Sequence, residues 1–515
     1  SPDGPIHKGG GLSKSRIGTP DLPAIGQSVG TKASSAAGSL LTLARTTAIP
    51  LPSRMNTNTA ARRRVRLLYR LGDGAGRRTL ETTAGQPNDL PAVVRYTADP
   101  PGVPPVAWRA VALLVQKFGG TAVGDPDRIR AVADHVARGV RSGDSVVVVV
   151  SAMGKETDDL LRLADGVSSA RPGREMDMLI TAGERKAMAL LCMAIHEAGV
   201  PADSFTGSQA GFLTDTNHMN ARILEVRPDR IRTALDEGRV PVVGGSQGVS
   251  TDNDVTFLGR GGSDTTAVAL AHAIGADACE LYTDVTGVFT TDPRIVPSAR
   301  RLSRISFDEL LEMTATGCPK PSVRSVEYAR AHRVRLHVRS AFTWQEGTWV
   351  EEEVPDMEQA IVSAVTHDLS EAKMTIAGVP DRPGVAARVF RALADLEVNV
   401  DMIVQNTSDH GVTDISFTVP HDELGRCQAL VGELVTELGA AGVSSDTGIA
   451  RVSVVGAGMR TNPGVAASMF ETLSDLGINI QMISTSAIRV SCMVDADRVE
   501  EAVQALHGAF GLAEL

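Results

Sequence analysis

Two hydrophobic patterns alternate along the chain from residue 111 onward. Short uninterrupted apolar runs are typical of buried strands, and longer segments with an apolar residue every three or four positions are typical of helices. Strands that alternate with helices predict an α/β fold, a three-layer α/β/α domain with a mostly parallel central sheet. The clearest strands are expected around 111–118, 145–150, 240–244 and 279–283, and the clearest helices in 125–140 and 176–199.

The last third of the chain contains an internal repeat. Residues 383–403 and 463–483 match at 12 of 21 positions without a gap. Each copy follows a predicted strand, begins with a Pro-Gly turn that opens a helix, and is followed by further strand patterns. The order strand, helix, strand, strand, helix predicts two small ferredoxin-like α+β modules.

Residues 1–110 differ in composition from the rest of the chain. They contain 15 Lys and Arg against 6 Asp and Glu, whereas the remainder contains 36 against 55. They are rich in Gly, Pro, Ser, Thr and Arg and lack sustained apolar periodicity, so we expect a disordered basic extension outside the functional fold. A nucleic-acid-binding tail and an organelle transit peptide are the alternatives.

Composition excludes several classes of protein. A chain of 515 residues with 43% apolar residues is long enough for about three domains with real cores. The five cysteines are scattered without a C-x-x-C pair, which gives no sign of a zinc site or a disulfide framework. No run of 18 apolar residues and no cleavable signal pattern occurs, so we expect a cytoplasmic protein without a membrane partner.

One short stretch combines groups that suit phosphate chemistry. The sequence LGRGGSDTTAVALA (258–271) has two glycines that allow close backbone approach, and a helix that begins there would offer free N–H groups to an anion. The common phosphate loop G-x-x-x-x-G-K-[ST] is missing from the sequence, so another phosphate chemistry or a simple tight turn remains open. The stretch contains Arg260, Gly261, Gly262, Ser263 and Asp264.

Further polar and glycine residues lie at or just beyond the ends of predicted strands. The carboxyl ends of parallel strands are where α/β sheets bind ligands, which favours a joint site for Lys117, Ser151, Gly244 and Asp284. Each residue alone also fits a plain structural role, such as a solvated surface lysine or a helix N-cap. The sequence VVGAGMR (454–460) lacks the third glycine of a dinucleotide fingerprint and is not expected to bind a dinucleotide.

Several motifs in order identify a family. QKFGG, SAMGKETDDLL, MDMLITAGER, SFTGSQAG, LGRGGSDTTAVALA, YTDVTGVFTTDPRIV and RSVEYA resemble those of aspartate kinases of the monofunctional actinobacterial type in the amino-acid kinase family, and the repeat resembles their tandem ACT modules. The resemblance covers residues 111–515. It implies a kinase domain over 111–345, a linker over 346–370, and ACT modules over 371–445 and 446–515.

The resemblance implies an activity and its regulation. The expected reaction is ATP-dependent phosphorylation of L-aspartate to 4-phospho-L-aspartate, the first step toward lysine, threonine and methionine, with Mg²⁺ on the ATP phosphates and no dedicated protein metal site. Lysine and threonine are the implied effectors, bound between ACT modules of different chains. The resemblance also implies a homo-oligomer, with or without a shorter regulatory chain, and no nucleic acid partner.

Site residues are carried over from the motifs. The implied catalytic residues are Lys117, Glu184, Arg260 and Asp264, and the implied aspartate pocket consists of Ser151, Thr157, Glu184, Arg260, Gly261, Gly262 and Ser263. The implied nucleotide contacts are Lys117, Gly119, Gly120, Thr121, Thr283, Asp284, Phe289, Thr290, Asp292, Arg294 and Lys320. The implied effector contacts are Asp381, Asn399, Asp401, Gln405, Val465, Ala466, Asn479, Ile480 and Ser486.

Three positions depart from the family pattern. Pro319 replaces a nucleotide-contacting lysine, with Lys320 shifted by one position; Phe289 replaces a frequent tyrosine; and Ala487 replaces a frequent glutamate. A non-catalytic or weakly active amino-acid sensor is therefore the alternative function. Glutamate and acetylglutamate kinases are the enzymatic rivals, but they would not explain the paired ACT-like repeat.

The resemblance also suggests where the functional chain begins. Val111 stands where the family's initiating methionine would be, six residues before Lys117. Valine is what a GTG start codon encodes when it is translated internally. We expect a chain that begins at this position to be fully active and regulated.

Overall fold

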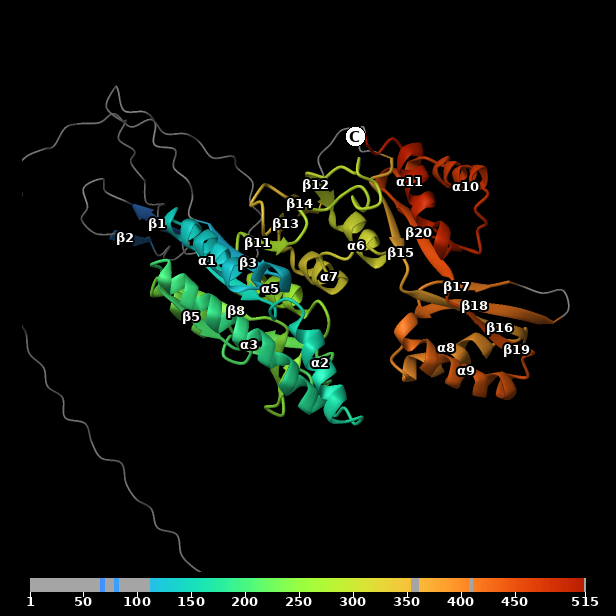
Figure 1. Ribbon diagram of the computed structural model, residues 1–515, viewed down its shortest axis with the longest axis horizontal. Helices are drawn as coiled ribbons and strands as arrows, with labels where there is room; N and C mark the ends of the chain where they lie inside the picture. Colours follow the sequence, from blue (N-terminus) through green and yellow to red (C-terminus); the bar gives the residue numbers. More distant parts are fainter. Residues whose placement is uncertain (1–64, 70–77, 83–111, 353–360, 407–410, 514–515) are drawn as a thin grey trace, which may run out of the picture. The chain divides into compact units, whose positions relative to one another are not determined.

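The computed structural model describes residues 65–69, 78–82, 112–352, 361–406 and 411–513 (Figure 1). The chain divides into two units, residues 1–108 and 109–515. In the first unit β1 (Val65–Tyr69) pairs antiparallel with β2 (Arg78–Thr82), where the sequence predicted no regular structure. The rest of the predicted basic extension and the expected start at Val111 lie outside the described residues.

The predicted mostly parallel sheet is confirmed in the second unit. Eight strands pair in the order β12-β14-β13-β11-β3-β4-β8-β5, and of their pairings only β13 with β14 is antiparallel. Valine dominates the inner strands, since β-branched side chains pack well on a sheet that is buried on both faces. The strands are β3 (Leu113–Phe118), β4 (Ser145–Val150), β5 (Ala202–Phe205), β8 (Val240–Gly244), β11 (Ala278–Thr283), β12 (Arg304–Ser306), β13 (Leu336–Ser340) and β14 (Thr348–Glu351).

Helices cover both faces of this sheet. One apolar cluster joins alternate residues of β3 and β4 to α1 and α3, and a second joins the other residues of these strands to α4, α5, α6 and α7. Helix α1 begins where the Asp125 side chain accepts a hydrogen bond from Arg128 N, and it buries the predicted positions Ile129, Val132 and Val136. The helices are α1 (Pro126–Arg141), α2 (Glu156–Val167), α3 (Gly173–Glu197), α4 (Asp229–Asp236), α5 (Gly262–Ile274), α6 (Phe307–Ala315) and α7 (Val323–His332), with a 3-10 turn η1 (Gly120–Val123).

A small second sheet borders the kinase-like domain. It has the order β10-β9-β6-β7 and is formed by chain segments between α3 and α5. Its strands β9 and β10 lead directly into the LGRGG turn at the start of α5. They are β6 (Phe212–Thr214), β7 (Ile223–Val226), β9 (Gln247–Ser250) and β10 (Val255–Phe257).

The repeat folds as the two predicted α+β modules. The first has the sheet order β17-β18-β16-β19 and the second β15-β20-β22-β21. The first comprises β16 (Glu371–Pro380), α8 (Val385–Asp395), β17 (Ile403–Gln405), β18 (Val412–Pro420), η2 (His421–Glu423), α9 (Leu424–Leu438) and β19 (Gly442–Asp446). The second comprises β15 (Ala364–Asp368), β20 (Ile449–Val455), η3 (Ala457–Thr461), α10 (Val465–Asp475), β21 (Met482–Thr485), β22 (Arg489–Asp495), η4 (Ala496–Arg498) and α11 (Val499–Ala509).

The predicted linker is partly structured. Of residues 346–370, β14 belongs to the central sheet and β15 is an edge strand of the second module, paired antiparallel with β20. The chain therefore enters the second module with one strand, builds the whole first module, and then returns. The first module is thus inserted within the second.

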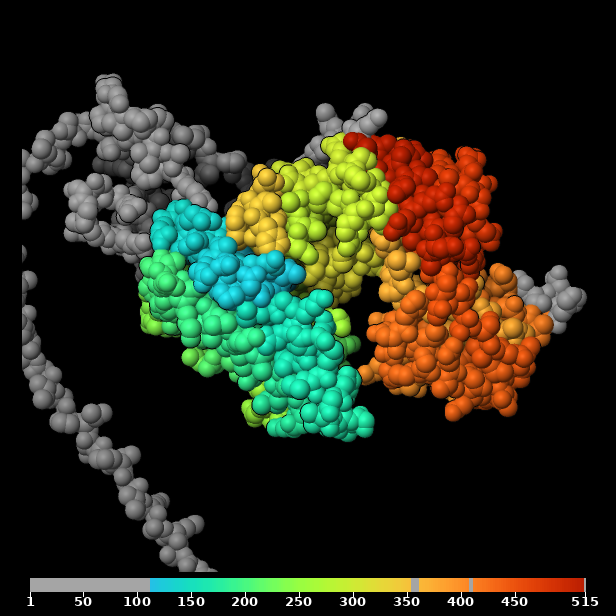
Figure 2. All heavy atoms as spheres, in the orientation of Figure 1, coloured from blue at the N-terminus to red at the C-terminus, as the bar shows by residue number. Residues whose placement is uncertain are grey.

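Helix α6 of the kinase-like domain contacts the second module along its length. Glu309 accepts hydrogen bonds from Ala457 N (3.1 Å) and Ser363 Oγ (2.6 Å), and one turn later Glu312 accepts one from Ser486 Oγ (2.6 Å). In Figure 2 the surfaces of these two parts adjoin, yellow-green against red. The helix is therefore one of the elements through which the two parts contact each other.

No helix in the described ranges is long and apolar enough to cross a membrane.

Candidate active site

A glycine turn follows β3 and packs closely on the neighbouring strand ends. Gly119 N donates to the carbonyl of Tyr282 at the end of β11 (3.2 Å), and Gly154 N donates to Gly120 O (2.9 Å). A Cβ at Gly120 would lie 2.7 Å from Ala152 O, so any side chain would push the turn away from β4. The turn therefore needs glycine, and it fixes the backbone beside Lys117.

Lys117 and Asp264 form a buried ion pair at this turn. Their Nζ and Oδ1 atoms are 2.5 Å apart, and both side chains are about 5% exposed. Burial would raise the pKa of Asp264, but the Lys117 ammonium, together with Lys320 and the Ser322 amide, holds that pKa below its ordinary value. The structure thus places a fixed cation and an ionised carboxylate at the carboxyl ends of the central strands.

The N-terminus of α5 carries the glycines and serine of the predicted pocket. Gly261 has φ of +74°, which a glycine adopts readily, and Gly262 begins the helix. Ser263 is buried, and its Oγ lies 2.9 Å from Ser246 Oγ. Since a Cβ at Gly245 would lie 2.7 Å from Ser263 Oγ, the glycine that follows β8 allows α5 to begin close to the sheet.

Glu184 is buried on α3 beside the same turn. Burial raises its pKa to about 7, although the backbone amide of Ala152 opposes this shift. Among the described residues its Oε2 is a buried atom without a hydrogen-bond partner. A buried polar atom without a partner is a candidate ligand contact, because leaving it unsatisfied destabilises the fold.

We expect Glu184→Gln to be more stable than the parent protein above pH 7. The folded-state pKa of about 7 exceeds the ordinary pKa of 4.5 for a glutamate side chain, so the folded state binds the proton more tightly, and this contribution to stability is lost as pH rises from 4.5 to 7. Thermal unfolding of both proteins at pH 5 and pH 8 measures it. If the variant and the parent protein differed in Tm by the same amount at pH 5 and at pH 8, Glu184 would not bind its proton more tightly in the folded state.

Three other predicted aspartate-pocket residues are less buried than Lys117 and Asp264. Ser151 follows β4, where its amide donates to Phe118 O (3.1 Å), and Thr157 lies half-buried in the first turn of α2. The Arg260 guanidinium is 90% exposed and lies 3.8 Å from Asp158 of α2. Arg260 is therefore positioned by its backbone more than by side-chain contacts.

The predicted nucleotide segment lies partly near this cluster. Thr283 ends β11 next to Tyr282. Asp292 and Arg294 form a close pair, with Arg294 Nη2 2.6 Å from Asp292 Oδ2. Thr121, in η1, is exposed.

The loop with the two prolines connects these regions. The charge of Lys320 contributes to lowering the pKa of Asp264, and Ser322 N donates to Asp264 Oδ2 (3.2 Å). This loop therefore contacts Asp264, a predicted catalytic residue, through Ser322 N. Pro319 beside it is exposed.

One residue of the predicted nucleotide segment, Thr290, contacts the second module instead. Thr290 is buried, its Oγ1 lies 3.0 Å from His507 Nε2 of α11, and its carbonyl accepts from Val365 N (2.8 Å). Phe289 forms a β-bridge with Arg301. These contacts give Thr290 a structural role between domains, and its nucleotide contact stays a prediction.

The predicted effector residues divide into exposed and engaged positions. Asp401 pairs with Arg451, and Ser486 with Glu312. Val465 is buried in the core of the second module, with Ala466 and Ile480 packed against that core. Asp381, Asn399, Gln405 and Asn479 are exposed.

Sequence reasoning missed several residues around the site. Arg324 of α7 donates hydrogen bonds to Leu258 O (2.7 Å), in the first residue of the LGRGG turn, and to Ala221 O (2.8 Å). It therefore holds these two segments together. Asp177 is fully buried and bonds to His218. The helical spacing of Asp177 and Glu184, seven residues apart on one face, was the available signal.

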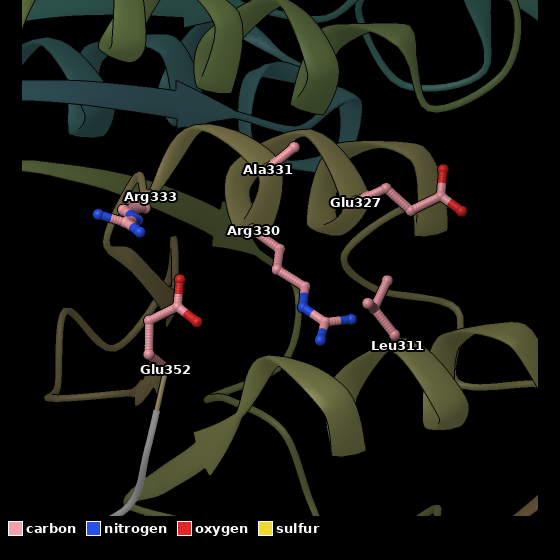
Figure 3. A pocket seen from close by; sticks show the side chains of 6 residues that line it. All are labelled: Leu311, Glu327, Arg330, Ala331, Arg333 and Glu352. Atoms are coloured by element: carbon pink, nitrogen blue, oxygen red, sulfur yellow. The ribbon is translucent and has the colours of Figure 1, made fainter.

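An open pocket lies away from this cluster. It has a volume of about 820 Å³, and Figure 3 shows Arg330 reaching from α7 toward Leu311 of α6. Its lining holds none of the predicted site residues, and Arg330 is paired with Asp308 (2.6 Å). The lining residues are Leu311, Glu327, Arg330, Ala331, Arg333 and Glu352.

Comparisons with known proteins agree with this architecture. Residues 112–340 match the amino acid kinase family, and residues 373–426 and 452–510 match ACT domains. The aspartokinase of Mycolicibacterium smegmatis is 54% identical over 407 residues, which cover 78% of this chain and 97% of the relative.

Solved structures give the same result. The chain is similar to E. coli aspartokinase III in complex with aspartate and ADP (R-state), with a TM-score of 0.66 and 26% identity over 77% of this chain and 99% of that one. The T-state of the same enzyme, in complex with lysine and aspartate, gives a TM-score of 0.61 and 25% identity over the same shares. With a relative more than half identical across both domain types, the chain belongs to the aspartate kinase family.

Proposed function

We propose that Lys117 and the glycine turn bind the transferring phosphoryl group of ATP while Arg260 and Glu184 hold L-aspartate. Phosphoryl transfer to a carboxylate brings several negative charges together, so positioning and charge stabilisation supply most of the catalysis. The buried Lys117–Asp264 pair at the glycine turn is the observation that carries this proposal.

Each side chain has a distinct part in the proposed reaction. The Lys117 ammonium stabilises negative charge on the phosphoryl oxygens, and Asp264 holds that ammonium in place. Ionised Glu184 accepts a hydrogen bond from the substrate's ammonium, which supplies the partner that its buried Oε2 lacks among the described residues. Arg260 binds a substrate carboxylate.

Mg²⁺ would enter with the nucleotide. A magnesium ion on the ATP phosphates neutralises part of their charge and usually keeps several waters, so it needs few protein ligands. Asp264, which lies beside Lys117, is the carboxylate that would bind it directly or through water. Lys320 and Arg294 supply further positive charge at the edge of the site.

A coupled assay of ATP consumption tests the proposed function. We expect turnover with L-aspartate and not with glutamate or acetylglutamate, and hydroxylamine trapping should reveal an acyl phosphate. Turnover with glutamate instead would contradict the substrate. No turnover with any of the three, despite amino-acid binding, would make the protein a sensor.

Lysine and threonine are the proposed effectors, in keeping with the first step of a pathway to lysine, threonine and methionine. The paired ACT modules support feedback by amino acids, and E. coli aspartokinase III has been solved with lysine. We propose that the effectors bind at a module interface formed with a second chain or a shorter regulatory chain.

We expect Ser486→Phe to weaken inhibition by lysine plus threonine at least about 10-fold, since the added ring would fill the proposed pocket. Inhibition curves for the parent and variant proteins measure it. Ser468→Phe, on the exposed face of α10, is the matched control for the added ring. Identical inhibition of the parent and Ser486→Phe would place the effector elsewhere.

A further inference from the structure

One face of α3 carries three buried polar residues. Asp177, Thr181 and Glu184 follow the spacing of a helix face, and Asp177 and Thr181 have no exposed surface. Thr181 Oγ1 donates to Asp177 O within the helix (2.8 Å). A fully buried carboxylate destabilises a fold unless its oxygens are hydrogen-bonded. The hydrogen-bond partners of Asp177 therefore show which segment of the chain it stabilises.

Both carboxylate oxygens of Asp177 hold the connection between β6 and β7. Oδ2 lies 2.7 Å from His218 Nδ1, and Oδ1 accepts a hydrogen bond from Met219 N (2.8 Å). Met219 has φ of +67°, a left-handed conformation that is strained for this residue type. The carboxylate therefore stabilises a backbone conformation that the local sequence would not adopt by itself.

This connection packs against the turn that carries Arg260. Ala221 N donates to Phe257 O (2.9 Å). Gly259 has φ of +84°, and a Cβ there would lie only 2.9 Å from Asn220 Oδ1. Arg324 joins the two segments, because its guanidinium donates one hydrogen bond to Leu258 O and another to Ala221 O. The backbone just before Arg260 is thus enclosed by residues that Asp177 holds.

We propose that Asp177 and His218 are positioning residues for aspartate binding, acting through the 218–221 segment on the backbone of Arg260. The inference rests on the proposed role of Arg260 in binding a substrate carboxylate. The Arg260 side chain is 90% exposed, so its reach is set by where the backbone places it. A displaced turn would move the guanidinium away from the substrate without altering the Lys117 side of the site.

A double-mutant cycle between Asp177 and Arg260 tests the inference. Asp177→Asn retains the size of the side chain but cannot accept both hydrogen bonds. We expect it to raise the KM for aspartate about 10-fold through misplacement of Arg260, with the KM for ATP changed less than about 2-fold. In an Arg260→Ala background the same substitution should change the aspartate KM less than about 2-fold, because the group that it positions is gone.

Thr181→Val is the matched control, since it removes a buried hydrogen bond one turn along the same helix without touching the 218–221 segment. It should lower Tm and leave the aspartate KM unchanged. If Asp177→Asn does not fold, His218→Asn replaces it in the same cycle, because that ring is 23% exposed.

The outcomes separate the two proposals. If Arg260→Ala raises the aspartate KM but Asp177→Asn raises both KM values equally, or if the two substitutions act additively, the positioning inference is wrong and the role of Arg260 stands. If Arg260→Ala leaves the aspartate KM unchanged, the proposed role of Arg260 fails and the inference fails with it.

Discussion

Replacement of Lys117 by alanine is expected to lower kcat at least about 100-fold, because it removes the cation nearest the proposed phosphoryl group from a buried site. The structure adds a second effect. Asp264 would remain buried without its partner, so its pKa would rise and the free energy of unfolding would fall by about 3 kcal/mol. Steady-state kinetics and urea unfolding measure the two effects separately.

A paired variant distinguishes charge stabilisation from loss of fold. Lys117→Met combined with Asp264→Asn removes both charges and should recover much of the lost stability while activity stays low. Lys155→Ala, an exposed lysine just before α2, is the matched control and should behave like the parent protein. Near-normal turnover in Lys117→Ala would refute the assignment of Lys117.

Replacement of Arg451 by methionine is expected to lower the free energy of unfolding by about 3 kcal/mol. Arg451 is 1% exposed. Its guanidinium pairs with Asp401 and with Glu371 (3.1 Å), and it donates to Asp368 (3.2 Å) and to the carbonyl of Ala315 at the end of α6 (3.0 Å). Methionine fills the space but leaves partly buried carboxylates facing each other.

Denaturant unfolding of the parent and variant proteins measures this loss. Arg388→Met is the matched control, because Arg388 pairs with Glu437 on an exposed helix surface, where solvent screens the ion pair and its contribution to stability is small. Equal losses for the two arginines would show that Arg451 behaves like a surface residue. The same variant should also respond less to effectors, since Asp401 is a proposed effector contact.

The placement of several candidate site residues at one edge of the sheet could be predicted, because they lie at strand ends. Lys117, Ser151 and Thr283 are far apart in sequence, yet parallel strands bring their carboxyl ends to one edge. The glycines beside them are visible in the sequence, and their close contacts explain their presence. The repeat likewise predicted two modules of one topology.

The parts that escaped prediction depend on contacts over long sequence separations. Thr290 bonds to His507, 217 residues away, and nothing in its local sequence indicates a partner in the second module. Asp177 and His218 are 41 residues apart, and their pairing needs the small sheet to form. The strand β15 is short and lacks strict alternation, so its segment resembled a linker.

The position of β15 has a consequence for how the chain assembles during synthesis. Its residue Asp368 meets Arg451 of β20 after an interval of 83 residues. At ribosomal rates of roughly 5–20 residues per second, β15 waits about 4–17 s for its partner strand. The first module can fold completely in that interval, and its two ends, Glu371 and Asp446, lie on the neighbouring strands β16 and β19. We therefore expect the nested module to act as a folding template that returns the nascent chain to β15, so that the second sheet closes last.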